Sequence, residues 1–222
     1  MERGMVPAIL LASVGMAGAC LAADPLPSIT PASVGEGWKL ASQSGGITLY
    51  SRSRPSSSLK EFKGIGDIEA STRAVHSVLD DVDGYPSFMP FTVECRILKR
   101  EGDSVFTYQR LSPKIVTDRD YTIRLHEKSW SAPGGLAYLN RWESANEQGP
   151  AERKGVLRVK LCEGAWLLEP QGTTKTRATY SIYTDSGGAL PAFIANKASE
   201  IGIRRIFAAV RKQVKDPKYN AE

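Results

Sequence analysis

Histidine and cysteine are scarce in this chain, which has 2 histidines and 3 cysteines among its 222 residues. His76 and His126 stand far apart in the sequence, and neither has a cysteine or carboxylate at the spacing of a metal ligand. Cys95 and Cys162 lack such a spacing as well. The sequence therefore predicts no metal site and no cofactor.

Basic clusters and long apolar runs are also missing. The chain has 29 Lys and Arg against 24 Asp and Glu, which gives a formal net charge of +5. This mild excess is compatible with an anionic membrane surface but falls short of the dense basic stripe that nucleic acid requires. Beyond the N-terminal region no apolar run is long enough to span a bilayer. We expect a monomer that contacts membranes transiently and binds no nucleic acid.

Residues 1–23 have the pattern of an export signal. A basic residue near the start is followed by an apolar stretch too short for a membrane span and then by small residues. Cleavage after Ala23 would release a soluble periplasmic or secreted protein. The run from Ala17 to Cys20 also resembles a lipoprotein box, so a lipid anchor at Cys20 is the alternative. Either way, we expect the protein to be exported.

One domain accounts for the rest of the chain. Its length is sufficient for a sizeable core, and neither pattern nor charge marks a second domain. We expect a linker at residues 24–35, where prolines and small polar residues gather. The domain is expected at 36–215, and a flexible tail at 216–222.

The order of predicted elements indicates the fold. A helix at 73–82, capped by Ser71 or Thr72, and a longer one at 191–214 show apolar residues at helical spacing. Segments with the length and composition of strands, each bounded by turn residues, span 46–53, 59–69, 91–100, 104–111, 120–130, 135–144, 155–170 and 175–185. This order predicts an α+β helix-grip fold, in which a curved antiparallel sheet wraps around the long C-terminal helix and leaves an internal cavity.

Alternation along the strands gives candidates for the cavity wall, because every second side chain shares a face of the sheet. The last helix adds further candidates. The alternative for most of them is plain core packing. The candidates are Val93, Cys95, Ile97, Tyr121, Ile123, Leu125, Leu136, Tyr138, Trp142, Leu157, Val159, Leu161, Phe193, Ile194 and Ile201. Tyr121 and Tyr138 stand out, because a buried phenol needs a partner and a ligand hydroxyl could serve. Cys162 falls on the outward face by this count, which argues against a disulfide with Cys95.

The segment TDSGGALP, residues 184–191, allows two interpretations. Asp-Ser-Gly-Gly resembles the turn around a nucleophilic serine, which would make Ser186 catalytic. The usual glycine before that motif is missing, and the chain offers no matching histidine region. The alternative is a hinge, in which Gly187 and Gly188 supply unusual backbone angles and Pro191 starts the last helix. We predict the hinge, through which the helix lifts to admit cargo, and no catalytic residue.

Charged residues near the strands also have two interpretations. Arg119 and Asp120, where a loop meets a strand, are either a pair that fixes a loop at the cavity mouth or an ordinary pair of opposite charges. Arg158 alternates with apolar neighbours, which places it on the outer face.

The last helix carries basic residues that include Arg204, Arg205 and Arg211. They form either a solvated surface or a docking patch for anionic lipid headgroups. On the second interpretation, reversing these charges slows lipid transfer and leaves the affinity for cargo intact.

Five segments in order resemble one family. They are GITLYSR near the start, DRDYTIRL around Arg119, ERKGVLRVKLCEGAWLLEP, ATYSIYTDSGGALP, and the C-terminal helix. Together they resemble the START domain, the steroidogenic-acute-regulatory-related lipid-transfer fold of the Bet v 1-like helix-grip superfamily, over about residues 36–215. The resemblance implies a cavity for one hydrophobic molecule, closed by the C-terminal helix and adjacent loops. Many relatives have an arginine where this chain has Leu125, so we expect a more apolar pocket here.

The sequence thus favours an exported protein that binds a lipid, sterol or other hydrophobic small molecule and carries or presents it. An enzyme of the cyclase, hydratase or hydrolase type on the same fold is the alternative, and titratable groups clustered in the cavity would favour it. A binding module without cargo, tied to a partner in the envelope, is a third hypothesis, which a well-filled interior would favour.

Overall fold

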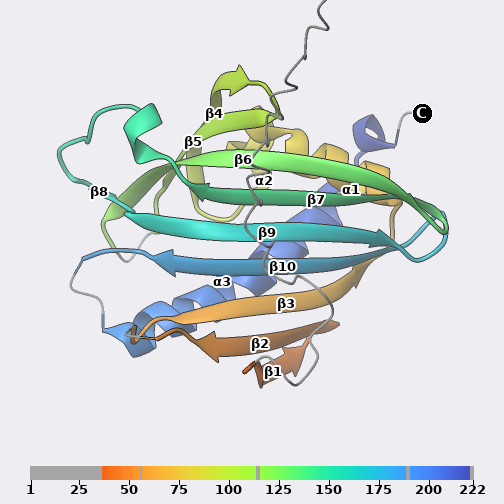
Figure 1. The fold of residues 1–222 in the computed structure, drawn as a ribbon, viewed down its shortest axis with the longest axis horizontal. Helices are drawn as coiled ribbons and strands as arrows, with labels where there is room; N and C mark the ends of the chain where they lie inside the picture. The colour runs from red at the N-terminus through yellow and green to blue at the C-terminus, as the bar shows by residue number, and fades with distance from the viewer. Residues whose placement is uncertain (1–36, 56, 114–115, 189–190, 221–222) are drawn as a thin grey trace, which may run out of the picture.

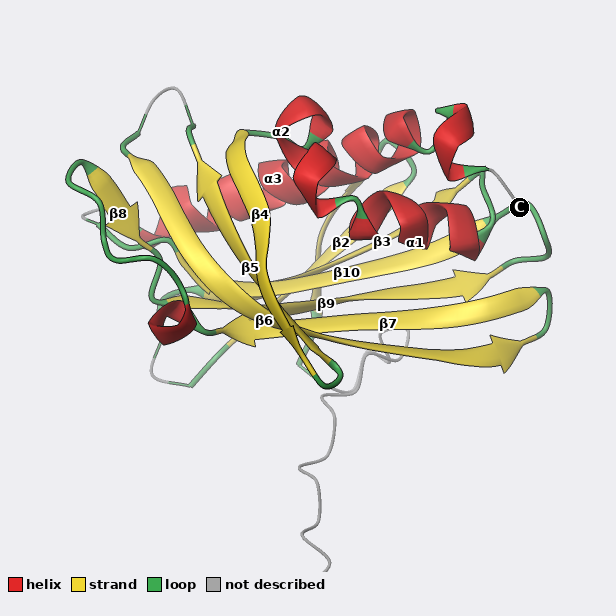
Figure 2. Ribbon diagram, turned by 90° about the horizontal axis from the view of Figure 1, so that it is seen from above, coloured by secondary structure: helices red, strands yellow, loops and turns green. Residues whose placement is uncertain are grey.

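A single large sheet covered on one face by helices forms the protein (Figures 1 and 2). The computed structural model describes residues 37–55, 57–113, 116–188 and 191–220. Within these ranges the sheet has ten strands in the order β1-β2-β3-β10-β9-β7-β6-β5-β4, and β8 pairs with β6 outside this path. The α-helices lie on one side of it (Figure 2). The helix-grip architecture predicted from the sequence is confirmed.

The elements follow one another along the chain with short connections. The strands are β1 Lys39–Ser44, β2 Ile47–Ser53, β3 Lys60–Ile68, β4 Thr92–Glu101, β5 Ser104–Leu111, β6 Asp118–Ala132, β7 Gly135–Ser144, β8 Val156–Arg158, β9 Leu161–Pro170 and β10 Thr176–Asp185. The helices are α1 Thr72–Asp80, α2 Tyr85–Phe88 and α3 Ala192–Gln213, with short 3-10 turns η1 Val82–Gly84, η2 Asn146–Gln148 and η3 Pro217–Tyr219.

Strand β6 gives the sheet its curvature. Its first half pairs with β5, from Arg119 opposite Leu111 to His126 opposite Ser104. Its second half pairs with β7, from Ile123 to Ala132. One strand thus belongs to two successive hairpins, and β4 and β5 bend away from the plane of β7, β9 and β10 (Figure 2).

Most predicted strands are confirmed within one or two residues, but the segment 155–170 is two strands rather than one. β8 pairs in parallel with the start of β6, whereas β9 pairs antiparallel with β7 and β10. The chain leaves the ladder at Val159 and Lys160, between the two strands. Strand β1 and the short helix α2 were not predicted.

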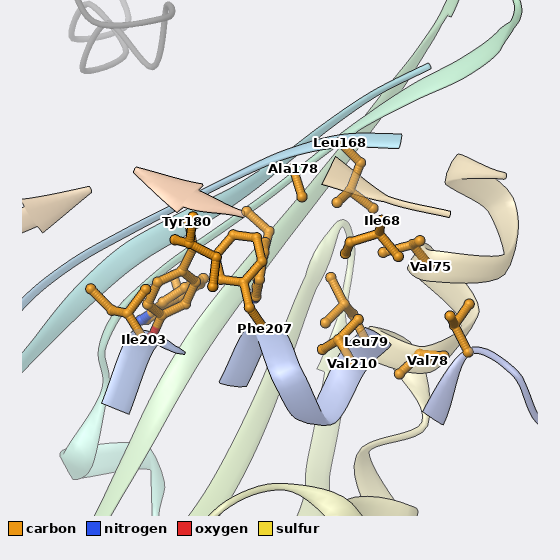
Figure 3. Close-up of a cluster of buried hydrophobic side chains, with 14 of the residues drawn as sticks. Ile68, Val75, Val78, Leu79, Leu168, Ala178, Tyr180, Ile203, Phe207 and Val210 are labelled. Carbon is orange, nitrogen blue, oxygen red and sulfur yellow. The ribbon is translucent and has the colours of Figure 1, made fainter. Parts of the chain in front are cut away.

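The buried core lies between the second half of α3, helix α1 and the inner side of β2, β3, β9 and β10. Figure 3 shows Ile203, Phe207 and Val210 of α3 reaching toward the sheet and α1. Two glycines of β3 allow this approach. A Cβ at Gly64 would lie 2.7 Å from Ile203, and one at Gly66 would lie 3.2 Å from Phe207. The bare backbone of β3 therefore lets α3 sit close against the sheet.

The prediction of a flexible tail at 216–222 is wrong for the residues up to Asn220. Asp216 accepts a hydrogen bond from the backbone N–H of Lys218, and Tyr219 is buried in the core cluster. The Tyr219 hydroxyl donates to the carboxylate of Asp81 at 2.5 Å, and Lys218 pairs with the same carboxylate at 2.9 Å. These contacts attach the chain end to the end of α1. The predicted signal peptide and linker lie outside the described residues.

Candidate ligand-binding surface

The two halves of α3 meet different surroundings. Ile203, Phe207 and Val210 in the second half are essentially inaccessible to solvent. In the first half Phe193 is 74% exposed and Ile201 is 44% exposed. The second half therefore packs as a core helix, while the first half leaves apolar side chains uncovered.

The inner side of the sheet near that uncovered half is itself only partly covered. Strand β6 lies between β5 and β7, yet its inner side chains keep accessible surface while they pack against the buried core. A central strand in a filled core would have fully buried inner side chains, as Leu168 of β9 has. We call the apolar, partly exposed residues here the inner apolar surface: Phe88, Met89, Tyr121, Ile123, Leu125 and Ile182.

The titratable groups at this surface are held in their neutral forms. Burial raises the pKa of Tyr121 well above its ordinary value, helped by the neighbouring Cys162, Tyr180 and Cys95. Burial also raises the pKa of Cys95 to about 12 and that of Cys162 to about 12. These thiols and phenols are uncharged at neutral pH. Both cysteines are free, so the structure contains no disulfide between them.

Several predicted wall residues lie on the inner side. Tyr121, Ile123, Leu125 and Tyr138 pack partly exposed against the core. Trp142 and Val159 are buried members of the core itself. Cys95 and Ile97 of β4 are partly buried, and Leu157 packs at the predicted hinge.

The structure corrects other members of the predicted wall. Cys162 belongs to the buried core, and alternation in β9 therefore puts Leu161 on the outer side. Val159 and Lys160 lie between strands β8 and β9. Assigning inward and outward side chains by alternation across both strands therefore gives the wrong side for Leu161. Val93 and Leu136 are exposed, as are the helix residues Phe193, Ile194 and Ile201, because they project into solvent rather than between sheet and helix.

The segment Asp185 to Gly188 is a tight turn anchored at both sides. Gly187 and Gly188 have φ values of 67° and 77°, which explains why glycine stands at each position. The carboxylate of Asp185 accepts a hydrogen bond from the Gly187 N–H at 2.9 Å. A Cβ at Gly187 would lie 2.5 Å from the Leu157 side chain. The turn therefore fits closely over β8 just before α3.

Arg119 attaches this turn to the sheet. Its Nε donates to the carbonyl of Ser186 at 3.2 Å, and its Nη1 donates to the carbonyl of Thr117. Arg119 and Asp120 form no ion pair with each other. Both interpretations treated Arg119 and Asp120 as a pair, whereas in the structure Arg119 holds the turn before α3 without Asp120.

Replacing Arg119 by alanine is expected to loosen the turn. Loss of a hydrogen bond from a charged donor costs about 1.5 kcal/mol, which corresponds to roughly tenfold faster local opening. Hydrogen exchange of the amides of residues 186–188 measures this rate. Arg153→Ala, which removes an exposed guanidinium elsewhere, is the control and should leave these amides unchanged. Equal exchange in both variants would contradict the role of Arg119.

Asp120 pairs instead with Arg158 on the outer side of the sheet, where Arg158 was predicted. Arg158 donates to both carboxylate oxygens at 2.7 and 3.2 Å, and the Tyr108 hydroxyl donates to Asp120 at 3.0 Å. Asp120 is 1% exposed. This buried pair fixes β8, and with it Leu157, against β6.

Neither histidine contacts Ser186. His76 lies 3.5 Å from the carboxylate of Glu127 and stacks on Tyr138, and His126 lies beside Ser104. Within the residues that the structure describes, no three His, Cys, Asp or Glu side chains form a group able to hold a metal ion. The Ser186 carbonyl is held by Arg119, which is consistent with the hinge interpretation.

Two polar residues at the inner surface were absent from the sequence prediction. Gln109 accepts a hydrogen bond from the Tyr121 hydroxyl and donates one to the Thr92 hydroxyl. Their polarity excluded them from a search for apolar residues. The alternation of β5 would have placed Gln109 on the inner side with Val105 and Thr107, because they share its phase.

A recess of about 300 Å³ lies on the opposite side of the sheet. Ion pairs occupy its wall, with Arg54 joined to both Glu61 and Glu163 at 3.0 and 3.1 Å. Its charged lining differs in kind from the inner apolar surface, which is the better candidate for a hydrophobic ligand.

Comparison with known proteins agrees with this geometry. A model of the family described as polyketide cyclase/dehydrase and lipid transport matches residues 68–211. The chain is 30% identical over 197 residues to the uncharacterized protein PA1579 of Pseudomonas aeruginosa, covering 87% of this chain and 89% of that one. It is 24% identical over 174 residues to the phosphatidylcholine transfer protein of Rattus norvegicus, covering 78% and 81%. The structure of a STAR-related lipid transfer protein from Xanthomonas axonopodis matches with a TM-score of 0.72 and 27% identity, covering 82% of this chain and 100% of that one.

The curved sheet, the gripped helix and the inner apolar surface define a START-type fold suited to a hydrophobic ligand. The chain belongs to the polyketide cyclase/dehydrase and lipid transport family. The resemblance to START domains found in the sequence is confirmed.

Proposed function

We propose that this protein binds a lipid, sterol or other hydrophobic small molecule against its inner apolar surface and carries or presents it, without chemical conversion. The observation that carries the proposal is the partly exposed inner side of β6, a central strand that the helices leave incompletely covered. The relative named for phosphatidylcholine transfer supports a carrier role. Residues Tyr121, Ile123 and Leu125 supply the apolar contacts.

The hinge gives the route by which cargo enters. The Arg119 contact to Ser186 holds the turn before α3, and the first half of α3 lacks the apolar packing of the second. We propose that release of this contact lets the first half of α3 move while Phe207 and Val210 stay in the core.

We further propose that the protein works in the cell envelope as a monomer. The pattern of residues 1–23 supports export. Mass spectrometry of the N-terminus tests both forms, since cleavage after Ala23 leaves an unmodified chain and a lipid on Cys20 adds its mass. An intact N-terminus in the cytoplasm would contradict export.

Transfer of labelled lipid between two vesicle populations tests the carrier role. The protein is expected to accelerate exchange of a fluorescent lipid in proportion to its concentration. Leu125→Asp, which places a charge on the inner apolar surface, is expected to abolish the acceleration, whereas Leu125→Met is expected to retain it. Failure of the wild-type protein to move any of several neutral and charged lipids would contradict the proposal.

The exposed side of α3 is suited to membrane contact. Phe193, Lys197, Ile201 and Arg205 recur at every fourth position and therefore share one side of the helix. Arg205 lies 4.9 Å above the ring of Phe91, which is itself 38% exposed. We propose that this stripe meets an anionic bilayer.

Two of the arginines predicted for membrane contact have structural partners. Arg204 donates to the carbonyl of Ser44 at 2.7 Å, and Arg211 donates to those of Gly45 and Asp67 at 2.8 and 3.0 Å. Both attach α3 to the sheet. Reversing their charge would therefore disturb the fold, and a test of membrane contact needs other residues.

The double variant Lys197→Glu and Arg205→Glu is expected to slow transfer between anionic vesicles at least tenfold, because each basic contact near a membrane contributes about 1 kcal/mol. Transfer between neutral vesicles and affinity for cargo should not change. Lys128→Glu reverses an exposed lysine of strand β6 and serves as the control. Equal slowing by the control would contradict a specific contact through α3.

A further inference from the structure

One polar pair interrupts the inner apolar surface. The Tyr121 hydroxyl donates to the side-chain oxygen of Gln109 at 2.7 Å, and the Gln109 amide nitrogen donates to the Thr92 hydroxyl at 2.8 Å. Tyr121 and Gln109 are both partly exposed, whereas Thr92 is buried. The buried Thr92 hydroxyl therefore holds the Gln109 amide, and both Gln109 and Tyr121 keep some accessible surface.

The pair has hydrogen-bonding capacity left over. The phenolic oxygen of Tyr121 can still accept a hydrogen bond, and the amide of Gln109 has a second N–H to donate. A hydroxyl group both donates and accepts, so one hydroxyl can satisfy both. Tyr121 and Gln109 together thus offer the acceptor and the donor that one ligand hydroxyl needs.

The inner side of strand β6 offers no unengaged charged side chain to a charged headgroup. Along the inner side of β6, the residues between Arg119 and Glu127 are Tyr121, Ile123 and Leu125, which carry no charge. Arg119 is engaged with the carbonyls of Thr117 and Ser186. Glu127 is engaged with His76 and with the amide of Asn140 at 3.2 Å.

The phenol of Tyr121 and the thiol of Cys95 stay uncharged at physiological pH. Burial raises the pKa of Tyr121 well above its ordinary value and that of Cys95 to about 12. A phosphate buried here would keep its charge without a counter-charge or a set of donors to offset it, which is strongly unfavourable.

We infer that the inner apolar surface selects an uncharged amphiphile with a hydroxyl group, which it anchors at Tyr121 and Gln109, and rejects lipids with a phosphocholine or other charged headgroup. This inference rests on the proposed carrier function and names its class of cargo. The apolar body of the ligand lies against Ile123, Leu125 and Ile182.

Matched pairs of probes test the selection, using protein expressed from the full chain. The first pair is pyrene-labelled diacylglycerol and pyrene-labelled phosphatidylcholine with the same acyl chains. The second is dehydroergosterol and its 3-sulfate ester. Energy transfer from the buried Trp142 and Trp166 reports binding. In at least one pair the neutral member is expected to bind at least tenfold more tightly than the charged member.

Variants then test the anchor. Tyr121→Phe and Gln109→Leu are each expected to weaken binding of the neutral probe about tenfold, since each removes one hydrogen bond to the hydroxyl. Tyr180→Phe removes a phenol from the neighbouring core and is the matched control, with binding unchanged. Thermal unfolding of each variant shows whether the fold is kept.

The outcomes separate this inference from the carrier function. If the charged probe binds as tightly as its neutral partner in every pair that binds, the selection is overturned and the carrier role stays intact. Selective neutral binding that Tyr121→Phe and Gln109→Leu do not weaken beyond the control would overturn the anchor. Binding of none of the four probes would overturn the carrier function itself, and the selection with it.

Discussion

Replacing Asp120 by alanine is expected to lower the free energy of unfolding by about 3–5 kcal/mol, because it leaves the charge of Arg158 in a nearly inaccessible site without its partner. The Asp120 side chain is 1% exposed and that of Arg158 is 10% exposed, with 2.7 Å between Nε and the carboxylate. Urea unfolding followed by circular dichroism measures the loss.

Two further variants serve as comparisons for Asp120→Ala. Tyr108→Phe removes only the hydrogen bond to Asp120 and is expected to cost about 1 kcal/mol. Arg153→Ala removes an exposed partner of Glu94 and is expected to leave the free energy of unfolding nearly unchanged. An Asp120→Ala protein as stable as Arg153→Ala would show that the buried pair does not hold β8 in place.

Truncating Phe207 to alanine is expected to lower stability by about 3–5 kcal/mol, whereas the same change at Phe193 costs less than about 0.5 kcal/mol. Both are phenylalanines of α3. Phe207 is inaccessible, with its ring 5.2 Å from that of Trp166, and Phe193 is 74% exposed.

This contrast tests the division of α3 into a fixed and an uncovered half. Phe193→Ala is expected to slow transfer between vesicles while leaving stability unchanged, because Phe193 lies on the proposed membrane stripe. Similar destabilisation by both truncations would mean that the first half of α3 also packs into the core, and the proposed hinge would then lose its basis.

The fold could be predicted well because its signals are local. Turn residues bound β5 and β7, whose limits were predicted to the residue, and helical spacing marks α1 and α3. The failure at 155–170 has a physical cause. Val159 and Lys160 leave the ladder without a glycine or proline to mark the break, so alternation carried across them assigned Leu161 to the wrong side.

The site could be predicted only in part, because alternation says which side chains share a side and not how well a helix covers them. It placed Tyr121, Ile123 and Leu125 correctly on the inner side. It could not show that Phe193 and Ile201 are exposed, which depends on where α3 leaves the sheet.

The sequence also could not show contacts between residues that lie far apart in the chain. Arg211 contacts the backbone of the turn between β1 and β2, more than a hundred residues away. Arg119 likewise reaches the turn before α3. Side chains that bind backbone carbonyls leave no pattern in the sequence, because any residue supplies the acceptor.

The most direct test of the carrier function is mass spectrometry of an organic extract of the protein purified from its native host. We expect a hydrophobic, uncharged, hydroxyl-bearing molecule in a stoichiometric ratio to the protein. A protein that is empty and also binds none of the neutral or charged probes would contradict the carrier function.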